Sequence, residues 1–168
     1  MNRPDKARVK SLLMDAPIGQ YIGEHGAEIL AECAYSEYEV ADNDFLFHQG
    51  DEDQCFYLIT SGHIALVKER KNKEKKPRTL HVLDRGDLVG ELSFIDDTPH
   101  TVSAIALGNS SVICFKDDDI RPLITKEPQF MFDFMRAIIK RVHSTVAAIG
   151  KQQMALSDYI ASGGKGRL

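Results

Sequence analysis

The stretch of sequence that decides the fold runs from residue 83 to residue 106 and reads LDRGDLVGELSFIDDTPHTVSAIA. Two strand-like apolar runs flank a Gly-Glu-Leu-Ser turn and an acidic segment. Gly90 lets the backbone come close to a ligand, and a short helix beginning near Glu91 would present backbone N–H groups that have no partner inside the helix. Such groups attract an anion. The stretch therefore predicts an anion-binding turn between two strands, with His100 on its far side.

Strand-like segments continue on both sides of this turn. From Tyr35 to Phe115, short apolar or alternating runs recur at intervals of roughly ten residues, which is typical of an antiparallel sandwich or barrel. The runs are FLFH, CFYLIT, HIALVKE, TLHVLD, TVSAIAL and SVICF. Because a positive φ angle is cheap only for glycine, we expect turns between these runs at Gly50, Gly62, Gly86 and Gly108. The sequence predicts a mainly β fold with flanking helices, an antiparallel β-barrel of the double-stranded β-helix or jelly-roll type.

Helical patterns flank the strands. The apolar spacing of residues 19–34 predicts a helix that packs one face on the core, and acidic residues open a predicted short helix at 117–128, which Pro128 closes. The expected organisation is a lead-in at 1–16, a β-barrel domain at 17–127, a long C-terminal dimerisation helix at 128–160 and a disordered tail at 161–168.

The predicted long helix carries an apolar residue at every seventh position, namely Met135, Val142, Ile149 and Leu156. Such a repeat is typical of the seam between two helices that supercoil with a left hand. The beginning of the helix, FMFDFM, is expected to fold back on the chain's own barrel. Ile138, Ile139 and Val146 lie between the repeat positions, and beyond Val142 the apolar stripe narrows. We predict a homodimer formed through residues 138–156, and the alternative is one helix packed only on its own barrel.

Composition and charge argue against several classes of function. The net charge of −4 does not suit a protein that binds nucleic acid through bulk positive charge. The three cysteines are far apart, so their spacing predicts no zinc site, iron–sulfur cluster or disulfide framework, and we expect free thiols. The N-terminus has no apolar signal segment, and no run reaches the roughly 20 apolar residues of a membrane span. We expect a cytoplasmic protein that does not associate with membranes.

Two stretches together resemble one family. Residues 47–67 read FHQGDEDQCFYLITSGHIALV, and residues 83–106, which we call the cassette, follow them. Together they contain Gly-Asp, an aromatic strand pair, Ser-Gly, a second Gly-Asp, Gly-Glu-Leu and Pro-His-Thr, in that order. This order and spacing is similar to the cyclic nucleotide-binding domain of the catabolite activator protein, kinase A regulatory subunits and nucleotide-gated channels. The resemblance covers most of the chain. It implies a short helix in the cassette, where the phosphate binds, and cyclic AMP or cyclic GMP as the ligand, with no other cofactor and no metal.

The resemblance also implies a set of ligand-binding residues. Glu91 would accept a hydrogen bond from the ribose 2′-hydroxyl, although a carboxylate at a helix start is also explained by the helix dipole alone. Thr145 on the long helix would meet the purine, while Val146 replaces a serine that accompanies it in the family. The other implied residues line the phosphate or the turn that holds it, and they are Gly90, Leu92, Ser93, Thr101 and Val102.

The sequence departs from the family at His100, where the family has an arginine whose guanidinium pairs with the phosphate. A neutral imidazole donates one hydrogen bond and carries no charge. Losing about 3 kcal/mol of charge-assisted hydrogen bonding would weaken binding on the order of 100-fold. Three interpretations of His100 stay open: a weak, pH-sensitive phosphate ligand, a ligand for a less charged molecule, or a surface residue of a site that no longer binds.

Other classes of function find little support in the sequence. The histidines form no His-x-His cluster of the kind that binds metal in cupins, and no serine or cysteine lies in a nucleophile motif. Only ASGGKGRL follows Ile160, where related transcription factors carry a helix-turn-helix. We expect neither an enzyme nor a direct DNA-binding protein.

Two hypotheses of function remain. In the first, the chain is a stand-alone regulatory domain that binds a cyclic nucleotide, with reduced affinity, and relays the signal through its C-terminal helix. In the second, it is a degenerate, ligand-independent dimeric module that binds a protein partner, for which the basic segment 68–78 is a candidate surface.

Overall fold

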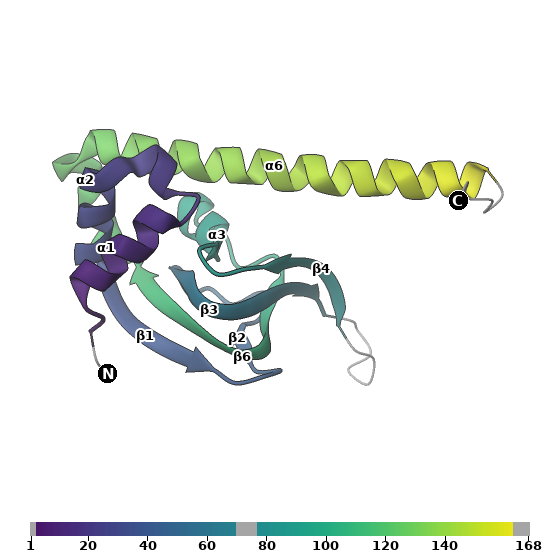
Figure 1. Cartoon of the computed structure of the whole chain (residues 1–168), viewed down its shortest axis with the longest axis horizontal. Helices are drawn as coiled ribbons and strands as arrows, with labels where there is room; N and C mark the ends of the chain where they lie inside the picture. The colour runs from purple at the N-terminus through teal and green to yellow at the C-terminus, as the bar shows by residue number, and fades with distance from the viewer. Residues whose placement is uncertain (1–2, 70–76, 163–168) are drawn as a thin grey trace.

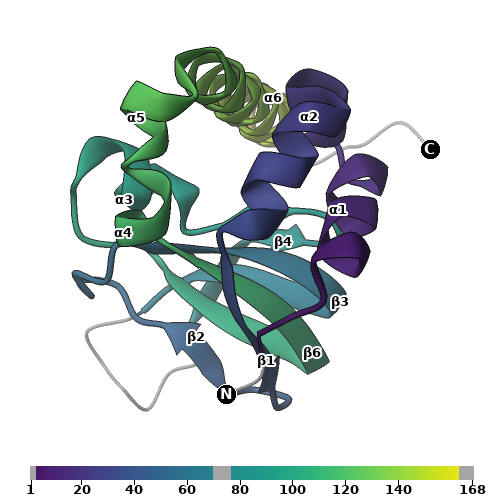
Figure 2. The same cartoon turned by 90° about the vertical axis from the view of Figure 1, so that its left-hand side faces the viewer.

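A computed structural model describes residues 3–69 and 77–162 of the chain. An antiparallel sheet forms one layer and helices gather over one of its faces (Figures 1 and 2). The strands are β1 (Ala34–Val40), β2 (Phe45–Phe47), β3 (Cys55–Lys68), β4 (Arg78–Leu83), β5 (Leu88–Val89) and β6 (Ser103–Lys116). The helices are α1 (Lys6–Asp15), α2 (Gly19–Glu32), α3 (Glu91–Asp96), α4 (Asp117–Ile120), α5 (Leu123–Lys126) and α6 (Pro128–Ala161).

The sheet has the strand order β1–β6–β3–β4, with β2 added to β6 and β5 added to β3. Every strand pair is antiparallel. This arrangement confirms the predicted mainly β fold with flanking helices. The tail expected at 161–168 and the basic segment 68–78 lie largely outside the described residues.

Successive side chains of the central strand β3 serve two different cores. Phe56 and Leu58 point toward the helices, whereas Tyr57 and Ile59 point to the opposite face, inside the curved sheet. The cause is the two-residue period of a strand, which sends neighbouring side chains to opposite faces. β3 is therefore buried on both faces and reads as the continuous apolar run CFYLI.

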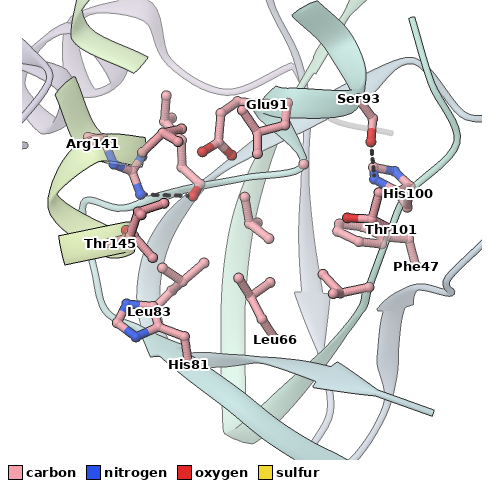
Figure 3. A pocket seen from close by; sticks show the side chains of 17 residues that line it. Phe47, Leu66, His81, Leu83, Glu91, Ser93, His100, Thr101, Arg141 and Thr145 are labelled. Carbon is pink, nitrogen blue, oxygen red and sulfur yellow. Dashed lines mark hydrogen bonds between the residues drawn. The ribbon is translucent and has the colours of Figure 1, made fainter. Parts of the chain in front are cut away.

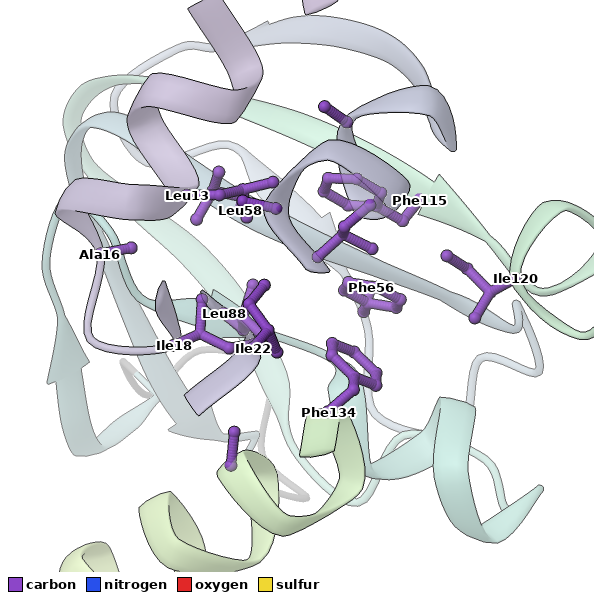
Figure 4. Close-up of a cluster of buried hydrophobic side chains, with 14 of the residues drawn as sticks. Leu13, Ala16, Ile18, Ile22, Phe56, Leu58, Leu88, Phe115, Ile120 and Phe134 are labelled. Carbon is purple, nitrogen blue, oxygen red and sulfur yellow. The ribbon is translucent and has the colours of Figure 1, made fainter. Parts of the chain in front are cut away.

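The core beneath the helices anchors the beginning of α6 (Figure 4). The ring of Phe56 stacks on that of Phe115, with centroids 4.9 Å apart, and packs against Phe134 of α6 at 5.5 Å. Aromatic pairs of this kind add to the stabilisation that burial of their area provides. The start of α6 is thus held on the chain's own sheet, as expected for FMFDFM.

Two of the four predicted glycine turns are not turns between strands. All four glycines have the expected positive φ, but Gly62 lies inside β3 and Gly108 lies inside β6, and both strands continue through them. Register shifts accompany Gly62, so the glycine belongs to a bulge in a continuous strand. A side chain at Gly62 would also place its Cβ 2.3 Å from Ser110 Oγ. The sequence correctly predicted the positive φ angle at Gly62, but the pairing of β3 with β6 shows that the glycine forms a bulge and not a turn.

The helices after β6 also differ from the prediction. The single short helix expected at 117–128 is two separate helical turns, α4 and α5, with Pro122 at the N-cap of the second. Pro128 occupies the first turn of α6, where its missing N–H costs nothing.

The 34-residue helix α6 is roughly 51 Å long at 1.5 Å per residue. Its first half lies over the core, and its C-terminal end projects beyond the sheet (Figure 1). All side chains from residue 151 to residue 162 are exposed. Within the described residues, no helix is both long enough and apolar enough to span a membrane.

Candidate functional site

A cavity of about 220 Å³ lies between the cassette, the sheet and α6 (Figure 3). One wall is formed by Gly90–Ser93 and by residues 100–102 of the cassette. The opposite wall is formed by residues of α6, namely Arg141, Val142, Thr145 and Val146. The seven ligand-binding residues implied by the sequence resemblance and His100, which departs from it, all line this one cavity.

The turn at Gly90 strongly favours glycine. Its φ of 85° and ψ of 1° are left-handed, and it is the N-cap residue of α3. A Cβ at this position would lie 3.1 Å from the carbonyl oxygen of Cys55 and 3.2 Å from Cε1 of His100. The close approach lets the first turn of α3, with its backbone N–H groups, line the cavity.

His100 is buried, with 3% of its surface exposed, so the interpretation of His100 as a surface residue is wrong. Its Nδ1 lies 2.9 Å from Ser93 Oγ, and its Nε2 lies 2.6 Å from Asp53 Oδ1. The ring also stacks on Phe47, with centroids 3.7 Å apart and an interplanar angle of 12°. Both ring nitrogens therefore already have protein partners, and a phosphate would have to displace Ser93 or Asp53 to reach one.

The backbone of His100 is fixed as firmly as its ring. Its N–H donates to the carbonyl oxygen of Asp51 at 3.0 Å, and its carbonyl oxygen accepts from the N–H of Gly50 at 2.8 Å. An ionised carboxylate only accepts hydrogen bonds, so Nε2 donates to Asp53. The loop before β3 and the end of the cassette are thereby joined into one unit.

Ser93, His100 and Asp53 together have the composition of a hydrolase triad. The geometry does not favour a nucleophilic serine, because Ser93 is 6% exposed. The imidazole is also clamped between Phe47 and two hydrogen-bond partners, so it is not free to move with a reacting group. We interpret the three residues as a buried hydrogen-bond chain that orients the ring.

Glu91 of the cassette wall lies close enough to Arg141 of the α6 wall to interact with its charge (Figure 3). Burial raises the pKa of the Glu91 carboxyl, Asp87 raises it further, and the charge of Arg141 opposes this rise. An Nη atom of Arg141 donates to the carbonyl oxygen of Leu88 at 3.2 Å and lies 3.5 Å from Asp87 Oδ1. In the described part of the chain, Arg141 is the single lysine or arginine that lines the cavity.

Arg141 was not among the site residues predicted from the sequence. Arg141 precedes Thr145 by four residues, which puts both side chains on one face of a helix, so the spacing was an available signal. Phe47 of β2, Leu66 of β3 and His81 of β4 were also missed, and they line the cavity from the sheet. Which strand positions face this cavity depends on how the sheet curves, and the sequence pattern does not show that. Among the described residues, no cluster of side chains is suited to hold a metal ion.

Comparison with known proteins gives results consistent with this geometry. A sequence model for the cyclic nucleotide-binding domain matches residues 37–127, more than half of the chain. Over 97 residues the chain is 29% identical to the cyclic AMP receptor protein of Thermus thermophilus, a match that covers 58% of this chain and 44% of that protein. This chain therefore spans under half the length of that relative.

Two solved structures show the same fold. A cyclic nucleotide-binding domain from Methylobacillus flagellatus superposes with a TM-score of 0.74 at 17% identity, over 96% of this chain and 87% of that one. The regulatory domain of Toxoplasma gondii PKA, crystallised with cAMP, superposes with a TM-score of 0.68 at 19% identity, over 83% and 50%.

Proposed function

Because the chain belongs to the cyclic nucleotide-binding domain family, we propose that it senses cyclic AMP or cyclic GMP in the cavity between the cassette and α6. One observation carries this proposal: the cassette and α6 form opposite walls of the same cavity, so a single ligand in it would touch both. A bound ligand would thus be linked to the position of α6, and α6 would relay the signal.

The size of the cavity supports a change in α6 on binding. Small-molecule sites usually enclose roughly 300–1,000 Å³, whereas this cavity measures about 220 Å³. A nucleotide would fill it and press on the wall that is less firmly held. That wall is α6, because the cassette is fixed through Gly90 and His100.

The polar groups of the cavity suit different parts of a cyclic nucleotide. Glu91 would accept a hydrogen bond from the ribose hydroxyl, and Thr145 would contact the base. The backbone N–H groups at Leu92 and Ser93, with Thr101 and Val102, would line the phosphate. Because the ring of His100 is engaged by Asp53 and Ser93, we expect affinity on the order of 100-fold weaker than an arginine at this position would give.

Ligand binding can be tested by thermal shift and titration calorimetry with cyclic AMP, cyclic GMP and cyclic dinucleotides, with linear AMP as the control. A ligand that binds only the folded chain raises the melting temperature by mass action. The same titration with Glu91→Gln should show weaker heat. If no cyclic nucleotide at millimolar concentration shifts the wild-type melting temperature, the sensor proposal is wrong.

We also infer that the chain forms a homodimer through α6. Several large apolar side chains along this helix are exposed in the single chain, namely Phe132, Met135, Ile139, Val146, Met154 and Leu156. An exposed apolar stripe on a projecting helix favours contact with a second copy. Light scattering on the double variant Ile139→Asp, Leu156→Asp should report a monomer, while Ala155→Asp, an exposed position on the opposite face of the helix, should not. A monomeric wild type at high micromolar concentration would contradict the inference.

A second candidate function is the ligand-independent interaction module. The buried His100 ring favours it, because the ring is satisfied by Ser93 and Asp53 without any ligand. A dimeric wild type with no ligand response would support this candidate.

We propose a cytoplasmic location for either function, which the free thiols of Cys33, Cys55 and Cys114 support.

A further inference from the structure

Two of the three cysteines lie side by side on neighbouring strands. In the register of β3 with β6, Tyr57 is opposite Cys114 and Cys55 is opposite Lys116. Opposite residues of an antiparallel pair share a face, and so do residues two apart in one strand. Cys55 and Cys114 are therefore diagonal neighbours on the face inside the curved sheet, and both belong to the core there.

The two thiols differ in exposure and in acidity. Cys55, at the first position of β3, is partly exposed, whereas Cys114 is 2% exposed. A hydrogen bond from the Cys114 thiol lowers the pKa of Cys55, Lys116 lowers it further, and burial, Asp53 and Asp117 oppose this. The same contact with Cys55, together with burial, raises the pKa of Cys114. The more exposed sulfur is thus the better nucleophile of the pair, because the thiolate is the reactive form.

The third cysteine, Cys33, belongs to the other core and its thiol is less acidic than that of Cys55. The Sγ of Cys33 contacts the carbonyl oxygen of Asp119 at 3.5 Å, and burial raises the pKa of this thiol to about 11. Cys33 follows α2 and packs with the core beneath the helices, which lies on the other face of the sheet. It therefore serves as an internal control.

We propose that Cys55 and Cys114 form a site of reversible oxidation by hydrogen peroxide, with Cys55 as the reacting cysteine and Cys114 as the resolving cysteine. The Cys55 thiolate attacks one peroxide oxygen, so that an S–O bond forms, the O–O bond breaks and the released hydroxide takes a proton to become water. Cys114 then gives up its proton and attacks the sulfur of the Cys55 sulfenic acid. The S–S bond forms, the S–O bond breaks, and the second water leaves. Two thiols and one peroxide give one disulfide and two waters.

The position of this pair places oxidation next to the cassette. The carbonyl oxygen of Cys55 is the nearest atom to a Cβ built on Gly90, at 3.1 Å. Asp53, two residues before Cys55, holds the ring of His100. Cys55 is the first residue of β3, so a short movement at the end of this strand can bring the two sulfurs into bond distance.

Mass spectrometry of the full chain, treated with hydrogen peroxide under native conditions and then alkylated, tests the proposal. Trypsin leaves Cys33 and Cys55 together on residues 11–68 and leaves Cys114 on residues 86–116, so a second cut after Glu37 or Glu39 is needed. The expected product is a Cys55–Cys114 cross-linked peptide that has lost two hydrogens, with Cys33 fully alkylated. Reduction with dithiothreitol should restore both thiols.

Two variants separate the oxidation of Cys55 from the later attack by Cys114. Cys33→Ser should form the same cross-link, and Cys114→Ser should instead accumulate a Cys55 sulfenic acid that dimedone traps. If Cys114→Ser does not fold, the wild-type peptide map decides alone. A Cys55 sulfinic acid with Cys114 still reduced, or a cross-link that includes Cys33, would overturn the proposal. The experiment contains no nucleotide, so its result is independent of ligand binding.

Discussion

The two walls of the cavity are held in place very differently. The cassette wall carries a buried imidazole with a hydrogen bond at each ring nitrogen and a glycine whose backbone conformation no other residue adopts cheaply. The α6 wall carries Arg141, which donates to the carbonyl oxygen of Leu88, while Val146 is 61% exposed. The first wall is preorganised and the second is only partly packed.

This difference indicates the direction of the signal. A ligand shifts an equilibrium only by its differential interaction with two states, and the element that can take a second position is the less constrained one. Substitutions in the cassette should therefore change ligand affinity strongly, whereas substitutions in α6 should change it by a smaller factor.

The largest effect is expected at the cassette turn, with Gly90→Ala. A left-handed residue with a side chain costs about 1–3 kcal/mol, and here the new Cβ also approaches the Cys55 carbonyl oxygen at 3.1 Å. We expect a lower free energy of unfolding in urea and no measurable binding. Gly108→Ala is the matched control, because Gly108 has a φ of 75° and nothing within 4 Å of a built Cβ. An equal loss in both variants would show that close approach to the cassette is unimportant.

The next largest effect is expected for His100→Arg. A guanidinium that reaches the phosphate should raise affinity on the order of 100-fold, while the loss of the stacked imidazole lowers stability. Titration calorimetry on the folded variant measures the gain. His63→Arg is the control, because His63 also pairs with an aspartate, Asp84 at 2.7 Å, but lies away from the cavity. A folded His100→Arg protein with unchanged affinity would place residue 100 outside the phosphate site.

Glu91→Gln should weaken binding by about tenfold to 100-fold, because a charge-assisted hydrogen bond contributes about 1.5–3 kcal/mol.

The same Glu91→Gln substitution should raise the free energy of unfolding at neutral pH. Burial raises the pKa of Glu91, so the folded chain holds this proton more tightly than the unfolded chain does. Wild-type stability then falls as pH rises from the ordinary glutamate pKa through the folded value, and the variant avoids this loss.

The pH dependence has a control of opposite sign at Glu24. Lys10 lowers the pKa of this carboxyl, so its contribution is present above the ordinary glutamate pKa and is lost as pH falls. Urea unfolding at several pH values should therefore show that Glu24→Gln loses stability at neutral pH, whereas Glu91→Gln gains it. The same sign for both variants would contradict the account of Glu91.

The smallest effect is expected on the α6 wall, for Thr145→Val. The change keeps the shape of the side chain and removes one neutral hydrogen bond, which contributes about 0.5–1.5 kcal/mol, so affinity should fall about twofold to tenfold. Ser144→Ala is the control, because the Ser144 hydroxyl donates to the Lys140 carbonyl oxygen within the helix. A loss as large as that of Glu91→Gln would make α6 an equal partner in binding and would weaken the distinction between the walls.

Much of the fold could be predicted from local patterns. Strand periodicity, the positive φ angles of four glycines and the boundaries of the long helix are set by residues close in the chain, and all of them agree with the structure. The turns predicted at Gly62 and Gly108 were wrong, because a glycine bulge and a glycine turn look alike until the partner strand is known.

The sequence by itself determined the order of the elements, the cassette turn that favours glycine at position 90, and the apolar repeat of α6. Tertiary structure alone decided what His100 does. Its partner Asp53 is 47 positions away, and its stacking partner Phe47 is the last residue of β2. It also decided that Arg141 reaches the cassette across the cavity. The physical reason is that backbone conformation depends on neighbouring residues, whereas the direction of a polar side chain depends on which distant groups the fold brings within hydrogen-bond distance.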